Sequence, residues 1–242
     1  MIIRKLFVFL LLSVLSLPMI FSKSAHAESY FGASIGVALS SEAESIDIVT
    51  GATTASITDL DASSSFAYGF KAGHYFKSIP WFGVEFNVFQ SDPDVDKQTT
   101  TLSGTANGIY AAGAGQTRID VNHMTTYGFL AMFRATEEQT KNMFNIEPYL
   151  GLGVAINNIS LGRGTAYDAA GAVLAGGVEN LGSDTSAGFL LSAGLNYKIN
   201  NHLKAYGEYK YTDVSFEDTT NGTKYDFDLD ASSLMFGVSY HF

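Results

Sequence analysis

The chain has 242 residues, of which 24 are Asp or Glu and 14 are Lys or Arg, so its formal net charge is −10. A chain this acidic repels the phosphate backbone, and we therefore expect no nucleic-acid partner. It has no cysteine, which excludes disulfides and thiolate metal sites, and its length suits one folded domain.

The amino-terminal residues have the pattern of a secretory signal peptide. Two basic residues near the start precede an apolar run, and Ala25 and Ala27 form a small-x-small cleavage site. The alternative, a transmembrane helix as anchor, needs about 20 apolar residues, and the run is shorter than that. The sequence thus predicts a signal peptide at 1–27 and an exported domain at 28–242.

In the exported domain, large apolar residues alternate with small or polar ones. This is typical of strands, because successive side chains point to opposite faces. The alternation is clearest in the last stretch, Leu234–Phe242, where every second residue is large and apolar. In chain order, the predicted strands are about 29–39, 61–76, 81–90, 118–134, 146–159, 186–199, 203–215 and a last strand that ends at 242.

The connections between these strands alternate in length. Short turns follow the second, fourth and sixth strands, and long polar segments follow the others, at 40–60, 91–116 and 160–184. Outer-membrane barrels have this asymmetry, with the short turns in the periplasm. We therefore predict an all-β fold, an eight-stranded antiparallel up-and-down transmembrane β-barrel with short periplasmic turns and long extracellular loops. A soluble barrel such as a lipocalin would turn the apolar faces inward, and charges on the opposite faces oppose that alternative.

Charged residues occur on the predicted inward faces at two depths. Those near the middle of the membrane are Lys71, Glu85, Glu208 and Lys210, and those near the periplasmic end include Arg134 and Glu147. Lys71 and Glu85 stand nearly opposite each other across the first short turn, and Arg134 and Glu147 are related in the same way across the second. Eight strands leave an interior just wide enough for side chains, where unpaired charges are costly. We expect ion pairs that plug the lumen; the alternative is a wet polar lumen without defined pairs.

Three segments carry a resemblance to a known family: Glu147–Val154, Tyr206–Asp213 and the Ser-Tyr-His-Phe end. The chain resembles the OmpA-like eight-stranded outer-membrane barrel family, which includes many surface antigens. The resemblance implies the outer membrane of a Gram-negative bacterium, with its lipid and lipopolysaccharide as surroundings. It also implies that the barrel-assembly machinery reads the terminal aromatic strand. The residues of that assembly signal are Phe236, Val238, Tyr240 and Phe242.

The sequence gives little support for catalysis. Ser239 and His241 share the inward face with acids such as Glu208, and a hydrolase would need all three in contact. Because Glu208 belongs to a different depth, we expect a non-enzymatic protein.

We also expect no metal and no cofactor. The segment Asp92–Asp96 lacks the glycine and the distal acid of a calcium loop. Asp226, Asp228 and Asp230 could hold divalent cations against lipopolysaccharide phosphates, but a solvated rim is the simpler interpretation. The four histidines of the exported domain are scattered, so we read no metal site from them.

The main hypothesis is a structural, surface-exposed barrel whose loops act as antigens or adhesins toward an extracellular ligand. The alternative is a narrow pore or a channel for small hydrophobic molecules. A lipid-modifying outer-membrane enzyme is a third, less favoured interpretation.

Overall fold

The protein is described here by a computed structural model. The residues that it describes are 28–39, 41–50, 53–93, 95–106, 109–110, 113–136, 140, 144–168, 170–173, 182–220 and 223–242. The expected signal peptide, with Ala25 and Ala27, lies outside these residues. Within them, no helix has the length and apolar character needed to cross a membrane.

Nearly all of the described residues lie in strands. In chain order these are β1 (Glu28–Ala38), β2 (Ser41–Thr50), β3 (Thr53–Ala62), β4 (Ser65–Phe76), β5 (Ile79–Ser91), β6 (Val95–Ala106), β7 (Ile109–Tyr110), β8 (Gly113–Arg134), β9 (Ile146–Tyr167), β10 (Gly182–Lys198), β11 (Leu203–Thr220) and β12 (Thr223–His241).

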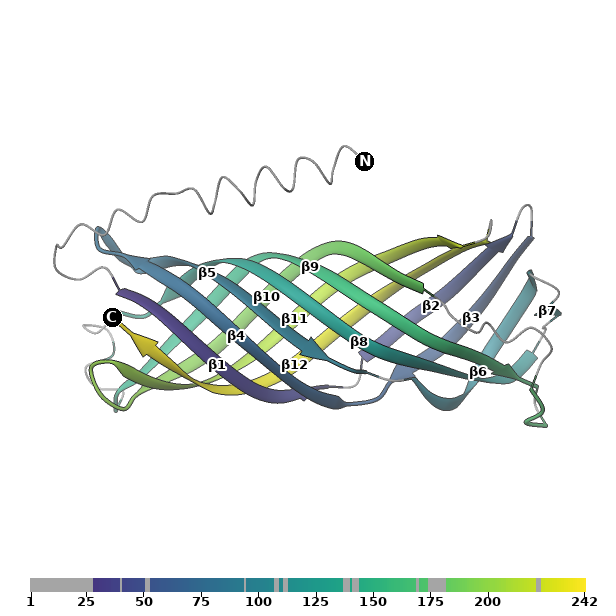
Figure 1. Cartoon of the computed structure of the whole chain (residues 1–242), viewed down its shortest axis with the longest axis horizontal. Coiled ribbons are helices and arrows are strands. Elements are labelled where there is room, and N and C mark those ends of the chain that lie inside the picture. The colour runs from purple at the N-terminus through teal and green to yellow at the C-terminus, as the bar shows by residue number, and fades with distance from the viewer. Residues whose placement is uncertain are drawn as a thin grey trace.

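The strands form one closed antiparallel barrel. Its order is β1-β4-β5-β8-β9-β10-β11-β12, and β1 pairs with β12 to complete the ring. The carboxy-terminal end of β12 lies at the same end of the barrel as the start of β1 (Figure 1). The predicted eight-stranded barrel is therefore confirmed.

The wall continues beyond this ring as a second section. At the other end of the barrel, β2, β3 and β6 fill the places of β1, β4 and β5, giving the order β12-β2-β3-β6-β8 (Figure 1). Much of the sequence expected as long loops at 40–60 and 91–116 thus forms strands. The physical reason is that strands with water on the outside need no apolar face, so their sequence lacks the alternation that reveals a strand.

The outer surface of the first ring is an apolar band. The carboxy-terminal residues of the expected assembly signal (Phe236, Val238, Tyr240 and Phe242) all point outward and are more than half exposed. Aromatic rings also gather around the first turn, where Trp81 stacks on Phe133 at 6.1 Å between centroids. An apolar band flanked by aromatic side chains is what a barrel in a bilayer requires.

Glycines let the strands approach one another inside this narrow ring. A Cβ on Gly153 would lie 1.9 Å from the carbonyl oxygen of Phe129, and one on Gly36 would lie 2.1 Å from that of Leu234. No side chain fits at such distances, so glycine is required at both positions.

Candidate functional site

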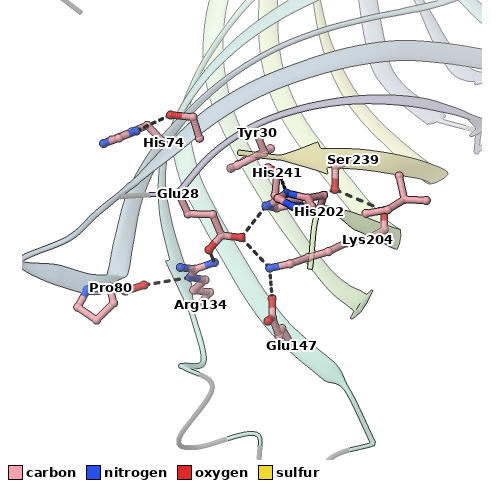
Figure 2. Close-up of polar contacts among 12 residues, drawn as sticks. Glu28, Tyr30, His74, Pro80, Arg134, Glu147, His202, Lys204, Ser239 and His241 are labelled. Atoms are coloured by element: carbon pink, nitrogen blue, oxygen red, sulfur yellow. Dashed lines mark hydrogen bonds and ion pairs between the residues drawn. The ribbon is translucent and has the colours of Figure 1, made fainter. Parts of the chain in front are cut away.

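The lumen holds two clusters of charged residues, and the first lies at the end of the barrel where the chain enters and leaves. Its centre is Glu28, whose carboxylate accepts hydrogen bonds from Arg134 and, at 2.9 Å, from Lys204 Nζ (Figure 2). His241 Nδ1 lies 2.6 Å from the same carboxylate, and Lys204 donates a further bond of 2.6 Å to Glu147. We call these five residues the periplasmic cluster. It links β1, β8, β9, β11 and β12 across the barrel.

The second cluster lies deeper in the lumen and consists of four charges. Lys71 Nζ is 3.1 Å from Glu208 and 3.8 Å from Glu85, and Lys210 Nζ is 3.2 Å from Glu208. All four side chains are at most 5% exposed. Two cations and two anions cancel, which is the arrangement that buried charges need. We call these residues the central cluster.

Hydroxyl groups complete the central cluster. Tyr30 donates to Glu85 at 2.6 Å, and Tyr149 and Ser192 donate to Glu208 at 2.9 and 3.1 Å. Hydrogen bonds to a charged acceptor are stronger than neutral ones, so each carboxylate is held by hydroxyl donors as well as by lysine. The result is a cross-link between opposite walls of the lumen.

The six charged residues selected from the sequence all take part in these clusters, but with different partners. Lys71 lies closer to Glu208 than to Glu85. Arg134 and Glu147 do not pair with each other; the cation contacts Glu28 and the anion contacts Lys204.

The β8–β9 register explains this difference. It sets Arg134 opposite Tyr149, so Glu147 lies two residues further along β9. Sequence reasoning missed Glu28, Lys204, Tyr30 and Tyr149. Their inward position could have been read from the alternation, but their partners come from distant strands.

Ser239, His241 and Glu28 form a chain of contacts that resembles a hydrolase triad. The serine hydroxyl is 2.9 Å from His241 Nε2, and Nδ1 of the same ring faces Glu28. However, Ser239 pairs with Gly32 on one side and Lys204 on the other, so the backbone around it is committed to the sheet. A hydrolase also needs donors for an oxyanion, and this arrangement supplies none from the neighbouring backbone. Glu208, the acid considered from the sequence, belongs to the central cluster.

Metal ligation finds no support among the described residues, which hold no group of three His, Asp or Glu side chains suited to an ion. Asp230 accepts a hydrogen bond of 2.9 Å from Tyr211. The side chains of Asp226 and Asp228, and the whole of Asp94, are outside the description.

Beyond the central cluster the lumen becomes apolar. The side chains that face it there are buried, and they are Phe89, Ile119, Val121, Met124 and Ile159. The lumen thus has a charged periplasmic half and an apolar extracellular half, a division that the alternation pattern did not indicate.

A closed antiparallel barrel with an apolar outer band and a charged lumen defines an integral outer-membrane protein. The sequence matches the family described as outer membrane protein beta-barrel domain over residues 7–242, and the chain belongs to that family. It is therefore a protein of the Gram-negative outer membrane. A comparison with curated protein sequences gave no match.

Solved structures give the same fold. OprG, an outer-membrane protein of Pseudomonas aeruginosa, is 17% identical with a TM-score of 0.53, and the match covers 89% of this chain and 96% of that one. Neisserial surface protein A is 13% identical with a TM-score of 0.44, covering 88% and 96%. The attachment invasion locus protein of Yersinia pestis is 14% identical with a TM-score of 0.38, covering 90% and 99%. At such identities the likeness concerns the fold alone.

Proposed function

We propose that this protein is a non-enzymatic structural barrel whose lumen is closed and whose function resides in the part of the wall outside the membrane. The observation that carries this proposal is the central cluster. Four buried charges and three hydroxyl donors fill the middle of an eight-stranded lumen, and an interior of that size has little room beyond its side chains. Such a barrel presents a surface and does not form an open pore.

The surface that it presents is the extended section of the wall. β2, β3 and β6, with the far ends of β8–β12, raise a rim beyond the apolar band. An antigen or adhesin acts through such a rim, and its ligand would meet the exposed polar side chains there. The proposal includes export through the signal at 1–27, an exported domain at 28–242, and recognition of the terminal strand by the barrel-assembly machinery. Lipid and lipopolysaccharide would surround the band.

Single-channel conductance of refolded protein in planar bilayers tests the closed lumen. We expect no steady conductance from the parent and openings from Lys71→Ala, Glu85→Ala and Glu208→Ala. The matched control is Asp120→Ala, which removes an ion pair with Arg118 that is largely exposed. Steady conductance in the parent would refute the closed lumen.

A second candidate function is a conduit for small hydrophobic molecules. The apolar extracellular half of the lumen favours it, because a lumen that serves only as a scaffold gains nothing from an apolar lining open to solvent. The two candidates differ in one measurable respect. A conduit binds apolar compounds inside the barrel, and a pure scaffold does not.

A further inference from the structure

A small cavity lies in the apolar half of the lumen, directly above the central cluster. We call it the upper cavity. Its volume is about 20 Å³, enough for one or two water molecules at its narrowest. The residues that line it include Ala38, Ala67, Phe89, Pro93, Met124 and Lys210.

Two polar groups at the upper cavity lack hydrogen-bond partners among the described residues. They are Lys210 Nζ and Ser233 Oγ, and both residues are at most 5% exposed. The lysine keeps its ion pair with Glu208, but an ammonium has three N–H donors. Buried donors without acceptors are rare, because each costs free energy comparable to a lost hydrogen bond. The cavity therefore offers donors to a guest.

The charge balance decides which acceptor fits. The two lysines of the central cluster are already neutralised by two glutamates, so a guest anion would add an unpaired negative charge in a buried place. Burying an unpaired charge is far more costly than burying a neutral polar group. A neutral acceptor, such as a hydroxyl or carbonyl oxygen, is therefore favoured over a carboxylate.

The barrel wall is interrupted next to this cavity. Among the described residues, backbone pairing between the second and third strands of the ring runs up to Ala67–Ser91 and resumes only at Thr58–Thr101. We call the intervening segments, 59–66 and 92–100, the wall seam. The amide of Gln98 spans it, donating to the carbonyl oxygen of Asp61 at 2.7 Å and accepting from its N–H at 3.1 Å.

The seam meets the cavity at the edge of the apolar band. Ser91 and Pro93 belong to the cavity lining, and Pro93 lies within the seam. Phe66, at the seam's lower end, points outward and is 62% exposed, as a lipid-facing residue would be. Proline supplies no N–H to a ladder, which fits its position in this gap. The outer leaflet of the membrane thus adjoins the cavity through the least paired part of the wall.

We propose that the upper cavity binds a neutral amphiphile, a molecule with a hydroxyl or carbonyl head and a short alkyl tail, which arrives from the outer leaflet through the wall seam. The head accepts from Lys210 Nζ and Ser233 Oγ. The tail lies against Ala67, Phe89 and Met124 and extends toward the seam. This inference deepens the second candidate function and leaves the central cluster closed, so binding and conductance are tested separately.

Photo-crosslinking tests the site. The protein, in lipid nanodiscs, is labelled with a decanol that carries a diazirine on its tail, and peptides are mapped by mass spectrometry. The same experiment is done with the decanoate of equal length. We expect labelling of the cavity peptides around Met124 and Phe89 by the alcohol in excess of the acid. Lipid-facing peptides around Phe236 should be labelled in all samples and serve as the internal reference.

Three variants identify the contacts. Ala67→Phe fills the cavity and should abolish cavity labelling, whereas Ala72→Phe, on the lipid-facing side of the same strand, should not. If Ala67→Phe does not fold, Ala67→Val takes its place. Lys210→Met removes a head-group donor and should reduce labelling by the alcohol about tenfold, the equivalent of one hydrogen bond.

The outcomes that overturn the proposal are specific. Labelling of lipid-facing peptides alone, or cavity labelling unchanged by the residue 67 variant, would mean that the cavity holds only water. Equal labelling by acid and alcohol would refute the neutral head group. Gln98→Ala loosens the seam and should speed cavity labelling; an unchanged rate would refute the seam as the route. A failed binding test with a non-conducting parent would leave the scaffold proposal intact.

Discussion

Replacing Glu208 by glutamine tests whether the lumen is held by buried charge. The carboxylate is 2% exposed and lies 3.1 Å from Lys71 Nζ and 3.2 Å from Lys210 Nζ, with hydroxyls of Tyr149 and Ser192 at 2.9 and 3.1 Å. Glutamine keeps the shape but leaves two ammonium groups with one remaining carboxylate. Removing one partner of a buried ion pair costs about 3–5 kcal/mol. We expect Glu208→Gln to lower the free energy of unfolding by that amount.

Urea unfolding of protein refolded in phospholipid vesicles measures this change through the fluorescence of Trp81, the single tryptophan. The double variant Glu208→Gln with Lys210→Met restores a net charge of zero in the central cluster and should recover about 1–3 kcal/mol. The control Asp120→Asn breaks an exposed pair and should cost less than about 1 kcal/mol. If Glu208→Gln costs no more than this control, water screens the lumen and the reasoning fails.

Three further predictions concern other parts of the barrel. Gly153→Ala should prevent refolding, seen as loss of the heat-modifiable band on gels, since its Cβ would meet the Phe129 carbonyl; Gly207→Ala, whose nearest contact is a flexible ring at 3.3 Å, should refold normally. Glu28→Gln should lower the free energy of unfolding by about 1–3 kcal/mol, less than Glu208→Gln because the glutamate is partly exposed; an equal loss would contradict this ranking. Phe242→Ser should reduce the folded barrel found in outer membranes of cells but leave refolding in vesicles nearly unchanged; equal defects in both would argue against an assembly signal.

The fold of the membrane section could be predicted from the sequence because the bilayer imposes a strict pattern. Along β12, Leu234 and Phe236 face lipid while Met235 is buried, and this period of two is visible in the letters alone. The extended wall escaped prediction because β2 and β6 lie beyond the apolar band. There both faces tolerate polar residues, so Ser- and Thr-rich strands look like loops.

The candidate site could be predicted only in part, for a related reason. Parity along each strand shows that Lys71, Glu85 and Glu208 point inward, and counting from the turns gives their depth. Partner choice across the lumen depends on the tilt and stagger of the closed ring. Lys71 and Glu208 are 137 residues apart in the chain, and no local pattern connects them.

The pairing of β1 with β12 brings the two ends of the barrel's chain together. Ser29 and Phe242 exchange backbone hydrogen bonds of 3.2 and 3.0 Å, so the order of strands around the wall is a cycle with no privileged starting point. A circularly permuted chain, joined between these residues and opened at the turn after β10, would keep every neighbour in the sheet. It would end on a different strand, however, with the aromatic strand now internal. Permutation would thus separate what the barrel needs to be stable from what a cell needs to recognise it.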